Sequence, residues 1–138
     1  MVIVIDASAL VKYVLREEDW SIVGRYIRYR RPLYSIDHIV KEVGNAIWKH
    51  CYIRRLINPD YALKLFKDLL DIIEVGVIVL EDEVKYVEDG LKISLKHGIT
   101  IYDSLYIVQA KKYGEILTCD EVQAKIASEM GIKTYFIE

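Results

Sequence analysis

The chain has 138 residues, of which 53% are hydrophobic and 29% are charged, and its formal net charge is −2. This length suits one domain over residues 1–138, and the sequence lacks an apolar run long enough to span a bilayer. The charge argues against a protein that coats nucleic acid through bulk charge, but it leaves room for local basic patches.

The first expected element is an aliphatic run at residues 2–5, which is typical of a strand buried on both faces. A strand so near the start leaves no room for a signal peptide, so we expect a cytoplasmic protein that does not contact a membrane. The elements expected next, in chain order, are a helix at about 8–17, a helix capped by Asp19, a strand from Leu33 to Ile36, a helix from Asp37 to about Leu56, a helix started by Asn58 and Pro59 that ends near Ile73, and a strand at 75–80.

The second half of the chain has a regular rhythm. Helices are expected near 82–97, 103–113 and 121–130, each followed by a glycine that favours a left-handed C-terminal stop: Gly98, Gly114 and Gly131. Short strands fit at about 115–119 and 133–137. This alternation predicts a three-layer α/β/α domain with a mainly parallel central sheet of four or five short strands.

Four carboxylates occupy positions where an acid is costly. Asp6 and Asp120 end strands, Asp103 opens a helix, and Glu42 lies within the helix that follows Asp37. The carboxyl ends of parallel strands form the edge where ligands bind, so the four side chains are expected to converge there. Because like charges raise each other's pKa values, such a cluster indicates a divalent cation at its centre.

Each acid also has an ordinary explanation. Asp6, Asp103 and Asp120 are favoured helix caps, and Glu42 could be a solvated helix residue. The four together favour a site, because the predicted topology puts three of them at the same edge of the sheet. Helical spacing places Glu42 on a polar stripe beside the apolar one, together with His38, Asn45 and Lys49.

Oxygen ligands select the metal. Carboxylates with hydroxyl and amide neighbours suit Mg²⁺ or Mn²⁺ rather than zinc. Ser8 follows Asp6 by two residues and Thr118 precedes Asp120 by two, so each could orient a carboxylate or a metal-bound water, or act as an ordinary capping residue. Mg²⁺ held in this way serves phosphoryl transfer.

Four local motifs resemble those of PIN-domain ribonucleases. They are the runs Asp6–Lys12, Glu42–Ala46, Thr100–Tyr106 and Leu117–Asp120, in the family's order and over essentially the whole chain. The length is most similar to the VapC-type toxins of prokaryotic toxin–antitoxin pairs. Two departures are visible, Ser104 where alanine is common and Gln123 where an apolar residue is usual.

The resemblance implies a Mg²⁺- or Mn²⁺-dependent endoribonuclease that acts on RNA. It implies that Asp6, Glu42 and Asp103 are the core metal ligands and that Asp120 completes the acidic set. Ser8 and Asn45 fit its accessory polar positions. The resemblance also implies a homodimer and an antitoxin protein that blocks the site.

Two basic regions are candidates for holding RNA. Lys49, on the polar stripe of Glu42, is the preferred phosphate contact, whereas His38 is expected to be a surface histidine. The densest basic stretch comprises Arg25, Tyr26, Arg28, Tyr29, Arg30 and Arg31. Arg and Tyr suit RNA, but a solvated helix face whose tyrosines pack inward is slightly favoured.

Single residues argue against two other classes of protein that place an acid at a strand end. A haloacid-dehalogenase-type phosphatase needs a second Asp where Ser8 stands, and a receiver domain needs an acidic pair where Ala7 follows Asp6. Two alternatives stay open: a catalytically silent PIN-like module that binds RNA or a protein, and a structural domain whose acids are only caps.

Overall fold

A parallel sheet of five strands forms the centre of the protein, whose computed structural model describes residues 2–138. The strands are β1 (Ile3–Ile5), β2 (Leu33–Ile36), β3 (Ile78–Glu81), β4 (Glu115–Thr118) and β5 (Lys133–Phe136). They lie in the order β3-β2-β1-β4-β5, and every neighbouring pair is parallel. The predicted sheet is confirmed.

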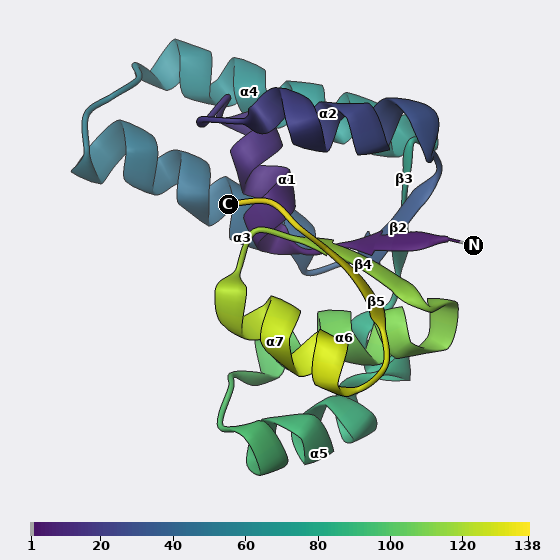
Figure 1. Cartoon of the computed structure of the whole chain (residues 1–138). Helices are drawn as coiled ribbons and strands as arrows, with labels where there is room; N and C mark the ends of the chain where they lie inside the picture. Colours follow the sequence, from purple (N-terminus) through teal and green to yellow (C-terminus); the bar gives the residue numbers. More distant parts are fainter. Residues whose placement is uncertain (1) are drawn as a thin grey trace.

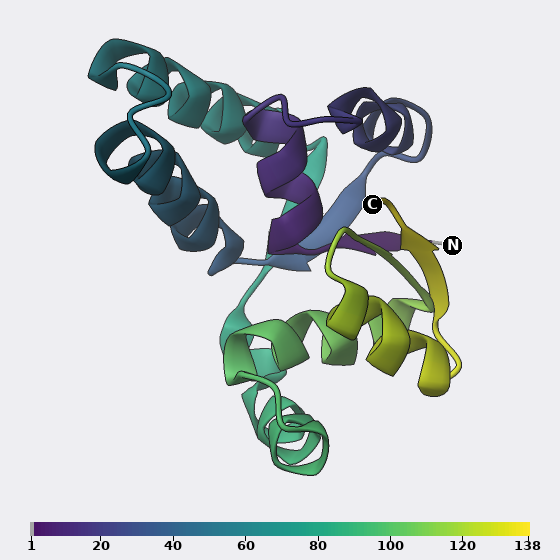
Figure 2. The ribbon, with the colours of Figure 1, turned by 60° about the vertical axis from the view of Figure 1, so that its left-hand side comes forward.

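Helices cover both faces of this sheet, which confirms the three-layer architecture (Figures 1 and 2). One face carries α1 (Ala7–Val14), α2 (Trp20–Tyr29), α3 (Ile39–Trp48) and α4 (Pro59–Glu74). The other carries α6 (Ile101–Tyr113) and α7 (Glu121–Glu129), and α5 (Val87–His97) lies outside α6. No helix within residues 2–138 is long and apolar enough to cross a membrane.

The strand order creates a switch point between β1 and β4. From β1 the chain proceeds to β2 and β3 on one side, and β4 and β5 then form on the other side. Both central strands are fully buried through Ile3–Ile5 and Ile116–Leu117, as expected for a sheet with helices on both faces. Ligands of open α/β sheets bind at the carboxyl edge of such a switch point, where Asp6 and Asp120 follow these two strands.

Local signals placed several helix ends correctly. Asn58 caps α4 by accepting a hydrogen bond from the Tyr61 N–H at 2.8 Å. The three predicted glycine stops all have positive φ, 71° at Gly98, 100° at Gly114 and 78° at Gly131. Gly90 serves a different purpose, because a Cβ there would lie 2.7 Å from Cδ2 of Leu105, so its absence lets α5 approach α6 closely.

Two predicted caps are wrong. Asp37 does not start a helix that reaches Leu56: α3 begins at Ile39, and a π-helix continues it over Lys49–Ile53. The Asp37 carboxylate instead accepts a hydrogen bond from the Glu83 N–H at 3.3 Å, which ties the end of β2 to a distant turn. Asp19 precedes α2 but has a φ of 65°, and its side chain makes no capping bond.

Candidate active site

Asp6 lies at the end of β1 and is only 2% exposed. Its Oδ1 accepts hydrogen bonds from the Ser8 hydroxyl at 2.7 Å and from the Ala9 N–H at 3.0 Å, and its Oδ2 accepts one from the Thr118 hydroxyl. Burial raises the pKa of Asp6 to about 6, even though the three hydrogen bonds oppose the shift, and the Asp120 charge adds to it. The structure therefore brings Ser8 and Thr118 to the carboxylate, as predicted.

Asp120 is coupled to Asp6 through Thr118. The Asp120 N–H donates to the Thr118 hydroxyl oxygen at 3.0 Å, while Oδ1 of Asp120 accepts from the Gln123 N–H at 2.9 Å. Asp120 thus does cap α7, as the structural explanation expects. Its charge also raises the pKa values of Asp6 and Asp103, so capping is not its whole effect.

Asp103 is not the cap of its helix. The cap is Thr100, whose hydroxyl oxygen accepts a hydrogen bond from the Asp103 N–H at 3.3 Å, and α6 begins at Ile101. The prediction that Asp103 opens the helix is wrong by two residues, and the capping explanation of its carboxylate fails. Burial raises the pKa of Asp103, and the charges of Asp120 and Glu42 raise it further.

Glu42 projects from α3 toward α6. Its Oε1 accepts a hydrogen bond from the Tyr106 hydroxyl at 2.6 Å and lies 2.8 Å from Nε2 of His38. Burial alone would raise the pKa of Glu42, but the contacts with His38 and Tyr106 hold it below its ordinary value. The carboxylate is therefore held ionised and fixed in place.

His38 and Tyr106 were not recognised as site residues from the sequence. The prediction of a surface histidine is wrong, since His38 is 4% exposed and its ring makes edge contacts with Tyr102 and Tyr106 at centroid distances of 5.7 and 5.0 Å. Burial raises the pKa of Tyr106, as does the Glu42 charge, so the hydroxyl stays protonated and donates. The only available signal was spacing, with His38 one turn before Glu42 and Tyr106 one turn after Asp103.

An open hollow of about 400 Å³ adjoins Glu42. Asn45 and Lys49, two of the predicted residues, line it together with the exposed ring of Tyr102. The predicted accessory and RNA-contacting positions are thus adjacent to one member of the acidic set. We use the name acidic rim for Asp6, Glu42, Asp103 and Asp120.

The acidic rim offers only hard oxygen donors. Within residues 2–138, no three Asp, Glu, His or Cys side chains lie close enough together to hold one metal ion directly. Mg²⁺ usually keeps several waters and binds through one or two carboxylates plus substrate phosphates, so the donor chemistry fits such an ion. Direct ligation by all four acids stays a prediction.

The fold and the acidic rim together define the PIN class of α/β domain. A family model described as PIN domain matches residues 3–129. Two relatives, both from Pyrobaculum aerophilum, extend over nearly the whole chain. Ribonuclease VapC3 is 30% identical over 126 residues, covering 91% of this chain and 94% of the relative. Exonuclease VapC9 is 27% identical over 135 residues, covering 96% of this chain and 92% of the relative. The chain therefore belongs to the PIN-domain family, and within it to the VapC type.

Proposed function

We propose that the protein is a Mg²⁺- or Mn²⁺-dependent ribonuclease that hydrolyses internal phosphodiester bonds of RNA. The observation that carries the proposal is the effect of neighbouring carboxylates on Asp6 and Asp103: Asp120 raises the pKa of Asp6 and of Asp103, and Glu42 raises that of Asp103. Gathering these charges costs folding free energy unless a cation neutralises them. The names of the two relatives, a ribonuclease and an exonuclease, support phosphodiester hydrolysis.

The residues of the acidic rim would hold the ion between them. A bound ion would supply an activated water and stabilise the negative charge that develops on the scissile phosphate. Three hydrogen bonds fix the orientation of Asp6, and His38 and Tyr106 fix that of Glu42. Lys49 and Asn45 would contact a phosphate beside Glu42, and the exposed Tyr102 ring would stack on a base.

Protein partners belong to the same proposal. We expect the protein to form a homodimer and to be the toxin of a toxin–antitoxin pair, bound by its antitoxin protein. An apolar hollow between α3 and α4 supports a protein-covered surface, because its lining includes Gly44, Ile47, Phe66 and the exposed side chains of Trp48 and Leu63. The alternative, a catalytically silent module, would also use this apolar surface to bind a protein. The two alternatives differ only in whether the protein cleaves RNA.

The test is cleavage of a circular single-stranded RNA, which has no ends for an exonuclease. With Mg²⁺ or Mn²⁺ the protein should convert circles to linear fragments, and Asp6→Asn, Glu42→Gln or Asp103→Asn should each lower the rate by on the order of 10²–10³-fold. Asp89→Asn is the control, because Asp89 is also the third residue of a helix but lies in α5, in contact with Lys92 at 3.8 Å.

Three outcomes would contradict parts of the proposal. Intact circles together with shortened linear RNA would indicate an exonuclease. Full activity in any of the three rim variants would rule out a catalytic metal site formed by the acidic rim. RNA binding by the wild type without any cleavage would favour the silent module.

A further inference from the structure

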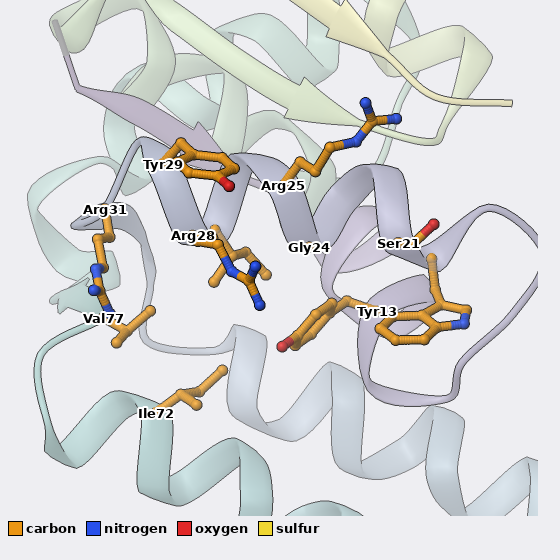
Figure 3. Close-up of a pocket in the computed structure, with 11 residues that line it drawn as sticks. Tyr13, Ser21, Gly24, Arg25, Arg28, Tyr29, Arg31, Ile72 and Val77 are labelled. Carbon is orange, nitrogen blue, oxygen red and sulfur yellow. The ribbon is translucent and has the colours of Figure 1, made fainter.

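A second large hollow lies away from the acidic rim. It measures about 620 Å³ and is lined by α1, by α2 and the segment that follows it, by the end of α4 and by the segment that leads into β3 (Figure 3). Arg31 lies two residues before the start of β2, and Val77 lies one residue before that of β3. This hollow is therefore at the amino edge of the sheet, whereas the rim is at the carboxyl edge. We call it the α2 hollow.

Three arginines line the α2 hollow, and no acidic side chain of residues 2–138 neutralises their charge. Arg25, Arg28 and Arg31 are exposed, no aspartate or glutamate of residues 2–138 is among the lining side chains, and none of the three arginines forms an ion pair with a residue in that range. Arg25 and Arg28 lie three residues apart on α2, a spacing at which like charges repel each other, and Arg31 follows shortly after the helix ends. Their concentration in a chain of net charge −2 therefore indicates an anionic ligand.

Neighbouring Arg30 behaves differently. Its side chain reaches β4 and β5, where the guanidinium donates to Oε2 of Glu115 at 2.9 Å and lies 3.4 Å from the hydroxyl of Tyr135. The basic stretch is thus divided into one arginine that holds the fold and three that face solvent. The prediction of a helix face with inward tyrosines fails for Tyr29, which is 73% exposed.

The aromatic side chains decide which anion fits. Trp20 and Tyr13 are already occupied, since the guanidinium carbon of Arg16 lies 4.1 and 5.2 Å from their ring centroids. Tyr29 is the exposed ring, and it lines both the α2 hollow and an adjacent hollow of about 360 Å³. Arg25 also lines both. An exposed ring that borders two open hollows suits successive bases of a single strand, with arginines on the phosphates.

The close-up shows how these groups are aimed. In Figure 3 the Arg28 guanidinium and the Tyr13 hydroxyl point into the same space, with Ile72 opposite them, and Arg25 extends in a different direction. Gly24 keeps α2 close to α1, because a Cβ there would lie 3.2 Å from the Tyr13 ring. The polar ends therefore stand over an apolar floor, where arginine can grip a phosphate with two parallel hydrogen bonds.

We propose that the α2 hollow is a second RNA-binding site, at the amino edge of the sheet, which grips single-stranded RNA by its phosphates and stacks a base on Tyr29. The proposal rests on the proposed function, because the RNA it holds is the one cut at the acidic rim. The site contributes to binding of long RNA and takes no part in hydrolysis.

The first experiment measures binding of a fluorescent oligouridine of about 20 nucleotides, in chelator, at several salt concentrations. The variant carries Arg25→Gln, Arg28→Gln and Arg31→Gln. Three lost phosphate contacts should weaken binding on the order of tenfold to a hundredfold at about 0.1 M salt, and should lower the slope of log affinity against log salt by about 2. The matched control removes the same charge at exposed lysines elsewhere: Lys64→Gln, Lys67→Gln and Lys92→Gln.

A second pair of variants isolates the base contact without changing charge. Tyr29→Ala should weaken binding about tenfold, whereas Tyr29→Phe keeps the ring and should bind as the wild type does. Tyr29 is exposed, so neither substitution should disturb the core. Thermal melting of all variants checks that the fold is retained.

Cleavage separates this proposal from the one on which it rests. With metal present, the arginine variant should cut an RNA of about four nucleotides as fast as the wild type, and an RNA of about 20 nucleotides more slowly at low RNA concentration. If the wild type cuts neither RNA but binding still depends on the arginines and Tyr29, the proposed function fails and the second site stands.

Unchanged affinity and salt slope in the arginine variant would overturn the second site, whatever the cleavage assay shows. So would equal binding by Tyr29→Ala and the wild type. If a polyglutamate peptide binds the wild type, loses affinity in the arginine variant, and RNA affinity does not change, the hollow serves an acidic protein partner instead.

Discussion

The two edges of the sheet gather charge in opposite ways. At the acidic rim, the charged groups are tied by the protein itself, with Asp6 held by three donors and Glu42 by Tyr106 and His38. At the α2 hollow, the charged groups are exposed and unpaired within residues 2–138, as Arg28 illustrates. Chemistry at a phosphate needs fixed geometry, whereas holding a nucleic-acid strand needs only charge and an aromatic face. The difference supports the two proposals, which place the reaction at the carboxyl edge and the binding of the RNA strand at the amino edge.

The comparison is tested most severely by removing one charge from the rim. In chelator at neutral pH, Asp103→Asn should unfold at a higher temperature than the wild type, because it relieves repulsion with Asp120 and Glu42. Excess Mn²⁺ should then stabilise the wild type by about 2.7 kcal/mol at a hundred times its dissociation constant, and the variant much less. Thermal melting with and without Mn²⁺ measures both effects.

Asp89→Asn is the control for this substitution. Asp89 and Asp103 are the third residues of α5 and α6, so each loses the same favourable interaction with its helix N-terminus. Asp89→Asn should therefore lower the melting temperature slightly and leave the Mn²⁺ response intact. If both variants melt alike and Mn²⁺ stabilises neither the wild type nor the variants, the rim holds no metal.

The pH dependence of the same pair has a defined sign. The pKa of Asp103 is raised in the folded protein, so the folded state holds that proton more tightly than the unfolded state. The stability that the folded state gains from binding this proton is complete below the ordinary carboxyl pKa. It is lost as the pH rises through the raised pKa of Asp103. The advantage of Asp103→Asn in chelator should accordingly be largest at neutral pH and should close as the pH falls.

The parts of this protein that the sequence predicted depend on local signals. The strand at Leu33–Ile36, the cap at Asn58 and the glycine stops need only neighbouring residues to be recognised. The positions of Asp6 and Asp120 at one edge followed from strand ends alone. Most of the fold and the location of the rim could therefore be predicted.

The parts that the sequence did not predict depend on residues far along the chain. Asp37 is not a cap because its carboxylate meets the Glu83 N–H, 46 residues away. His38 is buried because α6 brings Tyr102 and Tyr106 against it. Helical periodicity shows which side of a helix a residue occupies but not which distant element covers that side.

The rigidity of the rim is tested by removing one hydroxyl. Tyr106→Phe keeps the buried ring but deletes the donor to Glu42, so Mn²⁺ affinity should fall about tenfold while RNA affinity in chelator stays unchanged. The matched control is Tyr86→Phe, which deletes a similar bond from the Tyr86 hydroxyl to Oε1 of Glu81, 2.7 Å long. Calorimetric titration with Mn²⁺ measures the metal affinity of both variants and of the wild type.

Equal loss of Mn²⁺ affinity in Tyr106→Phe and Tyr86→Phe would mean that general stability, not the position of Glu42, sets metal binding. Unchanged affinity in both would mean that Glu42 needs no support from Tyr106. Only a loss confined to Tyr106→Phe agrees with a rim whose geometry is imposed by its neighbours.

The smallest expected effect concerns Lys49, which carries the one positive charge predicted to act beside the rim. Lys49→Gln should reduce the salt slope of RNA binding in chelator by about 0.7, one phosphate contact, against about 2 for the three arginines of the α2 hollow. Lys96→Gln, an exposed lysine on the outer helix α5, is the matched control and should leave the slope unchanged. Equal slopes for the Lys49 and Lys96 variants would remove Lys49 from the RNA path, and grip would then belong to the amino edge alone. A reduction for Lys49 near that of a single phosphate would instead show that the strand passes over both edges, with most of its charge contacts far from the bond that is cut.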